Sequence, residues 1–326
     1  MKGLGISVAM CTYNGSAFLP EQLESIADQT RLPDELIVCD DYSTDDTVEV
    51  IHAFARRAPF EVRLYVNENN LGITNNFANA IGLCTKEIIA LADQDDIWLP
   101  EKLDRIAEVF GTREEIAAVF SDAELIDRES CRISMHIWES FYFTRREQER
   151  FANGQALNIL LKHPVVTGAA MAFRRDFCEL LLPIPPNALH DYWISLLIAT
   201  CGKIEMIRDS LMQYRKHDGQ QIGAGTAGLP LAERAQIARK TTKGWYLSEI
   251  EGFGQLCERL DARAAQFPSR KDAIELIQKK ISHREIRARF PHSRFLRIPA
   301  VVGELMNGGY WRYSGGWKSV AKDLIL

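Results

Sequence analysis

Three carboxylates stand directly after an apolar run in the first third of the chain. Ile88–Ala92 has the composition of a strand buried on both faces, and Asp93, Asp95 and Asp96 follow it. Carboxylates crowded at a strand end repel one another, so a positive group is expected beside them. Mn²⁺ or Mg²⁺ suits such a place, because hard divalent cations prefer oxygen ligands and take further ligands from substrate phosphates. The alternative is a polar turn that caps a helix near Pro100, and these residues alone favour that alternative.

The strand before Asp93 is one of several that alternate with helices. Strands are expected at residues 6–10, 35–39, 62–66 and 88–92, with helices at about 18–29, 44–54 and 75–83 between them. Such alternation predicts right-handed crossovers and an α/β fold, with a mostly parallel sheet flanked by helices on both faces. Ligands bind at the carboxyl ends of parallel strands. The loops that should therefore converge on one cleft are 12–14, 40–41, 69–72 and 93–96.

Four polar segments stand at these strand ends, namely Cys11–Gly15, Val38–Thr47, Asn69–Gly72 and Asp93–Trp98. In order and spacing they resemble the nucleotide-sugar half of family 2 glycosyltransferases, which have the Rossmann-like GT-A fold. The resemblance covers about residues 5–220. It predicts a GT-A domain at 1–222, with a nucleotide-sugar-binding half at 1–100 and an acceptor half at 101–222. Residues 223–326 are then a helical, basic C-terminal extension.

The resemblance implies a role for each donor-side residue. The residues that would bind the nucleotide-sugar are Thr12, Tyr13, Asn14, Asp41, Asn70, Gly72 and Asp93. Within this set, Asp41 would accept a hydrogen bond from the imide N–H of uracil or thymine. Asp93 would contact the ribose or the metal, and Asp95 would be the direct metal ligand on the donor diphosphate. Asp96 is expected to cap the helix that follows.

The chemistry of the reaction agrees with these roles. Breaking a sugar–diphosphate bond develops negative charge on the leaving oxygens, which a metal held by Asp95 can neutralise. A nucleotidyltransferase is the alternative on this type of fold. It would need Gly, Lys and Arg in its first loop to hold a triphosphate, and residues 11–19 contain no Lys or Arg.

Asp191 is the candidate catalytic base. It precedes an apolar helix, and a single Asp in that position is most often an N-cap. The family pattern, however, places an acidic general base at this helix start. There it would take the proton from an acceptor hydroxyl whose oxygen attacks the anomeric carbon. A single base without a covalent intermediate implies inversion at the anomeric carbon. The sequence offers no second pair of carboxylates that would indicate a double displacement like that of a glycosidase.

Further candidates for the acceptor site and the metal site lie in the second half of the chain. An alternating segment at 165–175 reads as a strand, and its Thr167 and Gly168 resemble the floor of the acceptor site. Trp193 and Asp122 are acceptor candidates that a core position and a solvated turn would explain equally well. The segment Tyr214–Gln221 resembles the Tyr-Arg-x-His stretch of the family. From this segment His217 is a candidate third metal ligand, and Arg215 is a candidate partner for the diphosphate.

Charge is unevenly distributed along the chain. The net charge of −5 argues against a dedicated nucleic-acid binder, and we expect no nucleic-acid partner. Residues 270–318 nevertheless contain eleven Lys and Arg against four Asp and Glu, interleaved with aromatic residues. This segment can contact an anionic membrane, or it can be a basic helical pair packed on the acidic body.

Cysteine spacing and hydropathy indicate a cytoplasmic location. The seven cysteines show no C-x-x-C spacing, which is typical of reduced thiols in a cytosol. The chain begins without the shape of a signal peptide, and no apolar stretch approaches the roughly 18 residues that span a bilayer. We expect a cytoplasmic protein that can lie on the inner face of the membrane.

The sequence thus favours an inverting, metal-dependent glycosyltransferase. Its donor would be a UDP- or dTDP-sugar, its acceptor a glycan or lipid-linked glycan, and its product a bacterial surface polysaccharide. The whole pattern most resembles bacterial rhamnosyl-, glucosyl- or galactosyltransferases. The alternative from another class is a catalytically silent GT-A domain that binds nucleotide or glycan, or serves as an assembly scaffold.

Overall fold

The computed structural model describes residues 4–220, 243–291 and 293–325, which form two compact units. The first unit comprises Met1–Tyr142, Val166–Ile198 and Gly202–Gly225, and the second comprises Phe143–Val165, Ala199–Cys201 and Thr226–Leu326. The domain boundary predicted at 222/223 lies outside the described residues. Residues 143–165 belong to the second unit, although the sequence grouped them with the acceptor half.

The first unit is built on one sheet with the strand order β3-β2-β1-β4-β8-β6-β9-β5, and β7 pairs with β6. Its strands are β1 (Ile6–Thr12), β2 (Glu35–Asp40), β3 (Glu61–Val66), β4 (Ile88–Ala92), β5 (Ile97–Trp98), β6 (Ile116–Ile126), β7 (Arg132–His136), β8 (Met171–Arg174) and β9 (Lys203–Arg215). The first four strands are parallel, as predicted, and β8 then joins antiparallel to both β4 and β6. This α/β architecture confirms the predicted fold class.

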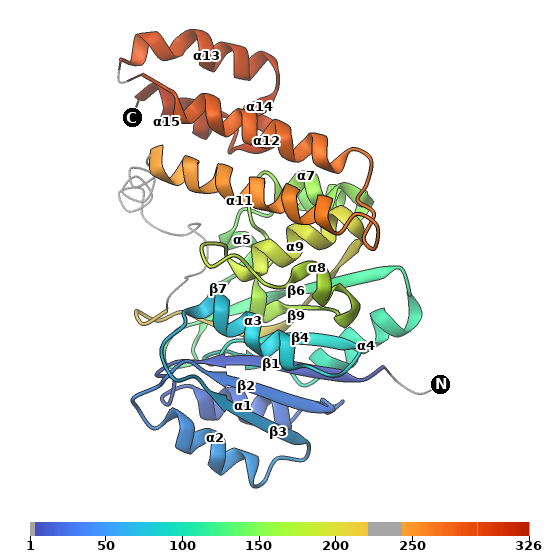
Figure 1. The fold of residues 1–326 in the computed structure, drawn as a ribbon. Coiled ribbons are helices and arrows are strands. Elements are labelled where there is room, and N and C mark those ends of the chain that lie inside the picture. The colour runs from blue at the N-terminus through green and yellow to red at the C-terminus, as the bar shows by residue number, and fades with distance from the viewer. Residues whose placement is uncertain (1–3, 221–242, 292, 326) are drawn as a thin grey trace. The chain divides into compact units, whose positions relative to one another are not determined.

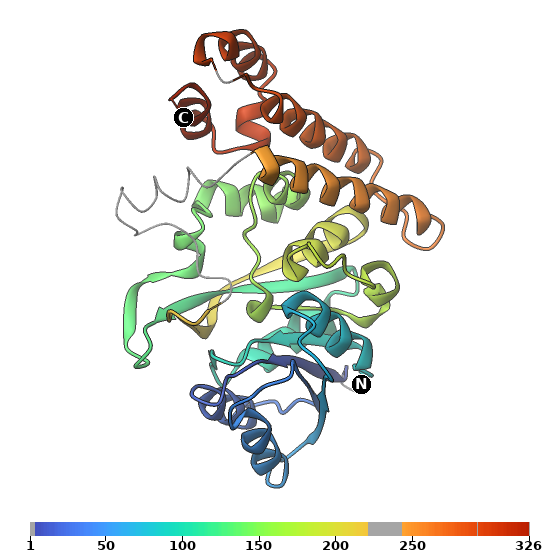
Figure 2. The ribbon, with the colours of Figure 1, turned by 60° about the vertical axis from the view of Figure 1, so that its left-hand side comes forward.

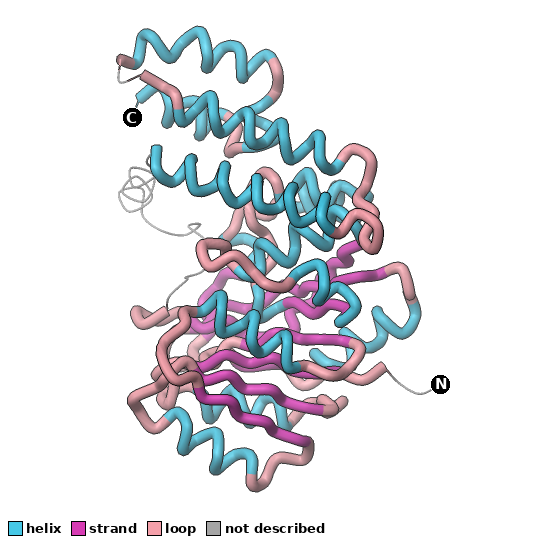
Figure 3. The backbone as a smooth tube through the Cα atoms, in the orientation of Figure 1, coloured by secondary structure: helices cyan, strands magenta, loops and turns pink. Residues whose placement is uncertain are grey.

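Helices cover both faces of the parallel strands (Figure 1 and Figure 3). The helices of this unit are α1 (Leu19–Ala27), α2 (Thr47–Ala55), α3 (Ile73–Leu83), α4 (Lys102–Thr112), α5 (Ile137–Ser140), α8 (Cys178–Leu181) and α9 (His190–Cys201), whose last residues belong to the second unit. Right-handed crossovers from β1 to β2 and from β2 to β3 put α1 and α2 on one face. The chain then crosses back to β4, so α3 lies on the other face.

The core lies between these helices and the central strands. β1, β2 and β4 are buried along their whole length, which explains why they read as continuous apolar runs in the sequence. β3 is an edge strand with exposed residues at both ends. The carboxyl ends of β1, β2 and β4 therefore have fixed positions at one edge of a rigid sheet. The polar loops begin at these strand ends.

One predicted strand is wrong in its first half. The segment 165–175 forms a strand only from Met171 onward, because Gly168–Ala170 makes a turn of 3₁₀-helix instead. The amide of Ala170 closes this turn by donating to the carbonyl oxygen of Thr167 over 3.1 Å. The turn points the amide of Gly168 away from the sheet, toward the start of α9.

The second unit is helical. It contains α6 (Arg145–Arg150), α7 (Ala156–Leu160), α11 (Lys243–Ala262), α12 (Ala273–Ala288), α13 (Arg294–Met306), α14 (Gly309–Tyr313) and α15 (Trp317–Ile325). Val301, Tyr310 and Val320 form a small apolar core between the last three helices. In the parts of the chain that the structure describes, no helix is both long and apolar enough to cross a membrane.

Candidate active site

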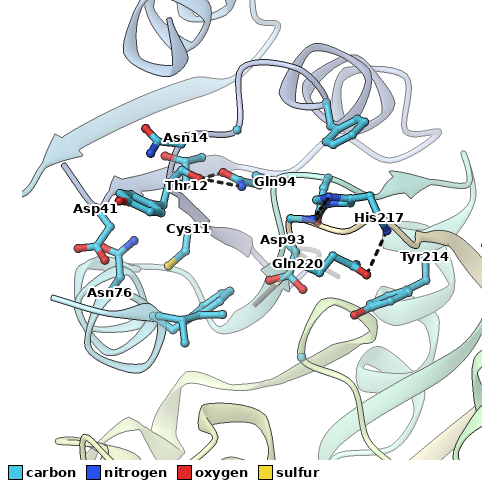
Figure 4. A pocket seen from close by; sticks show the side chains of 18 of the residues that line it. Cys11, Thr12, Asn14, Asp41, Asn76, Asp93, Gln94, Tyr214, His217 and Gln220 are labelled. Atoms are coloured by element: carbon cyan, nitrogen blue, oxygen red, sulfur yellow. Dashed lines mark hydrogen bonds and ion pairs between the residues drawn. The ribbon is translucent and has the colours of Figure 1, made fainter. Parts of the chain in front are cut away.

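A cavity of about 450 Å³ lies in the first unit, at the carboxyl ends of β1, β2 and β4 (Figure 4). The predicted site residues that line it are Thr12, Tyr13, Asn14, Asp41, Asp93, Asp95, Thr167, Gly168, Asp191 and His217. Three of the four loops expected to converge on one cleft therefore do so, namely 12–14, 40–41 and 93–96, whereas none of residues 69–72 lines the cavity. The predicted site residues outside the lining are Asn70, Gly72, Asp122, Trp193 and Arg215.

Asp41 is held in a fixed orientation by the loop before α3. The amides of Leu71 and Gly72 donate to its two carboxylate oxygens over 2.7 and 2.9 Å, and Asn67 Nδ2 donates over 2.9 Å. Gly72 has a φ of 81°, a value that favours glycine. Asn70 donates to the carbonyl oxygen of Asp41. Asn70 and Gly72, which were predicted to bind the nucleotide-sugar, are not among the residues that line the cavity, and both donate hydrogen bonds to Asp41.

The first loop, which follows β1 at residues 13–15, is held by hydrogen bonds to the loops that follow β2 and β4. Gln94 accepts a hydrogen bond from the amide of Tyr13 over 2.8 Å and donates one to its carbonyl oxygen over 3.1 Å. A Cβ on Gly15 would lie 2.1 Å from Oε1 of Gln94, so a larger residue at Gly15 would disrupt this clamp. On the other side, Asn14 Oδ1 accepts from the amide of Thr44 over 2.8 Å. The backbone around Tyr13 is therefore preorganised at the pocket edge.

The acidic turn after β4 carries a carboxylate–imidazole pair. His217 Nε2 and Asp95 Oδ2 are 2.8 Å apart, and both residues line the pocket. Burial raises the pKa of Asp93 to about 8, and repulsion from Asp95 and Asp191 adds to this effect. In Figure 4, Asp93 lies between Asp41 on one side and His217 on the other.

These side chains fit a divalent cation that shares its coordination with a phosphate ligand. Asp95 and His217 offer an oxygen and a nitrogen on the pocket wall, and the electrostatic strain on Asp93 would be relieved by a positive charge. Within the described ranges, no group of three or more His, Cys, Asp or Glu is arranged to hold a metal alone. Further ligands would have to come from a bound substrate or water.

Asp96 does not cap the following helix, so that expectation is wrong. Its side chain is fully buried, and Oδ1 accepts a hydrogen bond from the amide of Arg215 over 3.1 Å. Burial raises the pKa of Asp96 well above its usual range. The helix itself begins at Lys102, too far along the chain for Asp96 to reach its free amides.

Arg215 is a positioning residue, and the predicted contact with a diphosphate is corrected. Its side chain is 1% exposed and makes a dense set of bonds inside the protein. Nε donates to the carbonyl oxygen of Asp95 over 2.8 Å, one terminal nitrogen donates to Ser130 Oγ over 2.8 Å, and the other pairs with Glu21. The guanidinium also lies over the ring of Phe18 at 4.9 Å. Arg215 thus fixes the backbone of the turn that carries Asp95.

Asp191 lies in the first turn of α9, one residue beyond its start. Its Oδ2 accepts a hydrogen bond from the amide of Gly168 over 3.2 Å, and its Oδ1 accepts one from the amide of Tyr192 over 2.7 Å. The N-cap position belongs to Leu189, so the carboxylate is not an ordinary cap. It faces the pocket with its orientation set by two amides.

His190 is a pocket residue that the sequence analysis missed. It is 4% exposed and stacks on Phe77, with ring centroids 4.0 Å apart. Neither ring nitrogen has a hydrogen-bond partner among the described residues, and the same holds for the hydroxyl of Thr167. Burial lowers the pKa of His190, which favours a neutral ring. Buried polar groups are rarely left unpaired, so this part of the wall has the character of a ligand-binding surface.

Two acceptor candidates do not line the cavity, since Trp193 belongs to the core and Asp122 is a half-buried residue of β6. Trp193 is buried, and its Nε1 donates to the carbonyl oxygen of Leu181 over 2.9 Å. Asp122 lies within β6 and not at its end, because the apolar residues that follow it continue the strand. Its carboxylate accepts from the amides of Ala123 and Trp138 over 2.9 and 3.1 Å. Both predictions of a place in the pocket are therefore corrected.

Curated relatives are similar over about two thirds to three quarters of the chain. An uncharacterised glycosyltransferase of Nostoc is 29% identical over 220 residues, which is 65% of each chain. An uncharacterised protein of Mycobacterium tuberculosis is 26% identical over 65% of this chain and 59% of its own length. The dTDP-rhamnosyl transferase RfbG of Shigella flexneri is 24% identical over 74% of this chain and 82% of its own length. The chain thus spans less than two thirds of the Nostoc and Mycobacterium proteins.

Solved structures show the same fold at low identity. The structure of S. aureus TarS 1–349 in complex with UDP-GlcNAc has a TM-score of 0.55 and 15% identity, over 95% of this chain and 89% of that one. A mannosyltransferase from Pyrobaculum calidifontis in complex with GDP-Man and Mn²⁺ has a TM-score of 0.53 and 17% identity, over 100% of this chain and 86% of that one. The family model described as "Glycosyl transferase family 2" matches residues 7–182, which is more than half of the chain. With its GT-A fold and the polar cleft at the strand ends, the chain belongs to glycosyltransferase family 2.

Proposed function

We propose that this glycosyltransferase is inverting and metal-dependent, and that it moves a sugar from a UDP- or dTDP-sugar to a hydroxyl of a glycan or lipid-linked glycan. The observation that carries the proposal is that Asp41 and Asp95, from the loops after β2 and β4, and Asp191, from the first turn of α9, line one cavity. Asp41 suits the pyrimidine nucleobase, Asp95 suits a metal-bound diphosphate, and Asp191 suits the acceptor hydroxyl. The similarity to a dTDP-rhamnosyl transferase supports a role in bacterial surface polysaccharide synthesis.

On the donor side, Asp41 and the first loop bind the base. The carboxylate of Asp41 is fixed by two amides and one side-chain amide, so it would accept the imide N–H of uracil or thymine without reorganising. Thr12, Tyr13 and Asn14 line the same part of the cavity. The UDP-GlcNAc named for the TarS complex is a pyrimidine donor, whereas the GDP-Man of the mannosyltransferase is not, so the base has to be tested.

Asp95 and His217 would hold the Mn²⁺ or Mg²⁺, with Asp93 beside them. When bound, the cation supplies neutralisation of the charge that develops on the departing diphosphate. The Mn²⁺ named for the mannosyltransferase complex supports a divalent cation in this type of site. Arg215, whose side chain is buried, holds the backbone of Asp95 by donating a hydrogen bond from Nε to its carbonyl oxygen.

Asp191 acts as the general base. It takes the proton of the acceptor hydroxyl while the hydroxyl oxygen bonds to the anomeric carbon, and the bond from that carbon to the diphosphate oxygen breaks. The diphosphate leaves with the electron pair, and the configuration at the anomeric carbon inverts because the exchange is a single displacement. The amide of Gly168 keeps the carboxylate aimed at the cavity. His190 and Thr167 hydrogen-bond hydroxyl groups of the bound sugar or acceptor.

Thermal unfolding in the presence of nucleotides tests the donor site. A ligand that binds only the folded state raises the unfolding temperature by mass action. We expect UDP or dTDP with Mn²⁺ to stabilise the protein, and neither to do so with EDTA. Stabilisation by GDP or CDP in their place would contradict the role of Asp41. No stabilisation by any of the four would favour the alternative of a catalytically silent scaffold.

Asp191→Asn tests the base. With the donor that the binding experiment identifies, release of nucleoside diphosphate should fall by about 10² to 10⁴-fold, because one general base contributes about that much. The nucleotide-induced stabilisation should stay unchanged. Asp104→Asn, also in the first turn of a helix but exposed, is the matched control and should leave both readouts at wild-type levels. Undiminished turnover in Asp191→Asn would rule out this residue as the base.

A further inference from the structure

The helix α13 presents an apolar surface to solvent. Phe295 and Met306 are 82% and 84% exposed, and Ile298 and Val302 lie between them at helical spacing. Residues separated by three or four positions share one face of a helix. A row of this length, without a covering element in the described parts of the chain, is unusual for a protein surface and indicates an interaction site.

This exposed row is distinct from the face by which α13 packs. Val301 and Leu305 point inward, to the small core formed with Tyr310 and Val320. Through that core α13 contacts both α14 and α15, and the three helices lie side by side in two views (Figure 1 and Figure 2). The inner face anchors the helix, and the outer apolar face packs on no element within the described residues of the second unit.

The neighbouring helices α14 and α15 each carry a further exposed apolar side chain, a tryptophan. Trp311 in α14 and Trp317 at the start of α15 meet edge to face, with ring centroids 5.4 Å apart. Gly316 between them has a φ of 59°, and a Cβ there would lie 2.3 Å from the ring of Trp311. Trp317 is 65% exposed. Exposed Trp is typical of surfaces that contact the interface between lipid and water.

The exposed charges of residues 289–325 are of one sign. The only acidic residues in the sequence from 289 to 325 are Glu304 and Asp323, and both are buried. Glu304 pairs with His283, and Asp323 accepts two hydrogen bonds from Arg287, at 2.7 and 2.9 Å. The exposed charged residues that this segment presents are all basic, namely Arg289, Arg294, Arg312 and Lys318.

We propose that α13, α14 and α15 form a peripheral binding surface for an anionic lipid bilayer. The exposed apolar row of α13 would enter the interface, while the basic side chains contact lipid phosphates. A second copy of the chain is a poorer occupant, because a symmetric contact would place the same basic side chains opposite each other. The proposal does not depend on the glycosyl-transfer reaction, but it would bring the enzyme to the surface where lipid-linked acceptors are found.

Vesicle co-sedimentation of the full chain, without nucleotide, tests the proposal. We expect binding to vesicles of phosphatidylcholine mixed with phosphatidylglycerol, no binding to phosphatidylcholine alone, and weaker binding at high salt. The double variant Phe295→Ser with Met306→Ser should bind roughly tenfold or more weakly, because it removes the most exposed apolar groups. Arg294→Glu with Arg312→Glu should lose binding to the anionic vesicles.

Matched controls separate the surface from general effects. Leu32→Ser removes an exposed apolar side chain of the first unit, and Arg56→Glu reverses an exposed charge there, so both should bind like the wild type. An unchanged unfolding temperature shows that each variant is folded. Absence of binding to anionic vesicles, or equal binding by Phe295→Ser with Met306→Ser, would overturn the proposal. The proposal would also be overturned if light scattering showed that the wild type is a dimer and that the double variant Phe295→Ser with Met306→Ser is a monomer. None of these results bears on turnover or nucleotide binding.

Discussion

The backbone amide of Gly168 donates a hydrogen bond to Oδ2 of Asp191 over 3.2 Å, so the turn before β8 sets the orientation of the first turn of α9. The same glycine leaves room for the imidazole next to Asp191. A Cβ added to Gly168 would lie 2.7 Å from Nε2 of His190 and 3.5 Å from Cβ of Asp191. The carboxylate of Asp191, which we propose as the base, and the imidazole of His190 therefore both depend on a residue without a side chain.

Gly168→Ala should lower turnover because its Cβ would displace His190 and tilt Asp191. We expect release of nucleoside diphosphate to fall about tenfold to a hundredfold, since small misplacements of reacting groups cost about this much. Gly111→Ala is the control, because a Cβ on Gly111 meets nothing within 4 Å. Steady-state kinetics of both variants decide, and a Gly168→Ala variant as active as Gly111→Ala would contradict the proposed geometry.

Replacing Arg215 should destabilise the fold and loosen the metal site together. Arg215→Met leaves the carbonyl oxygen of Asp95 without its donor, and an unpaired buried polar group typically costs about 1–3 kcal/mol of unfolding free energy. Urea denaturation measures this loss. The exposed Arg57 makes a comparable pair with Glu24, and Arg57→Met should change stability very little.

If Arg215→Met does not fold, Arg215→Lys provides the test. It keeps the charge but cannot make the several bonds of a planar guanidinium. The expected result is a folded protein whose stabilisation by nucleotide with Mn²⁺ is reduced, because the carbonyl oxygen of Asp95 is no longer held. A wild-type response to nucleotide and Mn²⁺ would show that Arg215 does not position this turn.

His190→Phe should separate substrate contact from packing. A phenyl ring can keep the stacking on Phe77 but removes both unpaired ring nitrogens. The unfolding temperature should be retained or raised, since the variant removes two buried ring nitrogens that have no hydrogen-bond partner among the described residues. Turnover should fall, because a hydroxyl of the bound sugar or acceptor loses its partner. His52→Phe, at an exposed position of α2, should leave turnover unchanged. Equal turnover of His190→Phe and the wild type would make the imidazole a packing group only.

Glu147 should make the second unit sensitive to acid. Burial alone would raise the pKa of this carboxyl, but hydrogen bonds from His163 and Lys162 outweigh burial and lower it from 4.5 to about 2. An acid whose folded-state pKa is depressed stabilises the fold above its unfolded-state pKa, and that stabilisation is lost as the pH falls through the folded-state value. The contribution of Glu147 should therefore be complete above about pH 4.5 and gone near pH 2.

Denaturation of Glu147→Gln across this range provides the measurement. The variant should be less stable than the wild type at neutral pH, and the two stability curves should approach each other as the pH falls from 4.5 toward 2. Glu149→Gln is a control, since that side chain is exposed on the same helix. A difference between wild type and Glu147→Gln that does not vary with pH would contradict the depressed pKa.

The arrangement of the parallel strands followed from the sequence, because each buried strand is a continuous apolar run with a polar loop at its end. Those loops predicted Thr12, Asp41 and Asp95 as cleft residues, whereas Asp191, which lines the same cavity, was found only through the resemblance to the family. The errors concern the direction of side chains. Arg215 reads as a phosphate ligand beside His217, yet it is the last residue of β9 and its side chain points into the protein.

Local patterns also could not show which groups would be buried together. His190 was visible beside Asp191, but its burial depends on Phe77, more than a hundred positions earlier. Asn70 and Gly72 were recognised as belonging to the donor loop, while the bonds that direct them to Asp41 and away from the cavity arise only in the folded sheet. The hydrophobic periodicity of the sequence predicts helices and strands, whereas these contacts depend on how the helices and strands pack against one another.

The bonds of Arg215 also bear on the order of folding. The guanidinium connects to Glu21, Asp95 and Ser130 across 194, 120 and 85 positions of the chain. Contacts of such long range form late, because a large loop has to close first. During synthesis, the strands that precede Asp95 can pair as soon as they emerge. The turn that carries Asp95 reaches its final geometry only after β9 has docked, so the donor site matures well after the sheet that supports it.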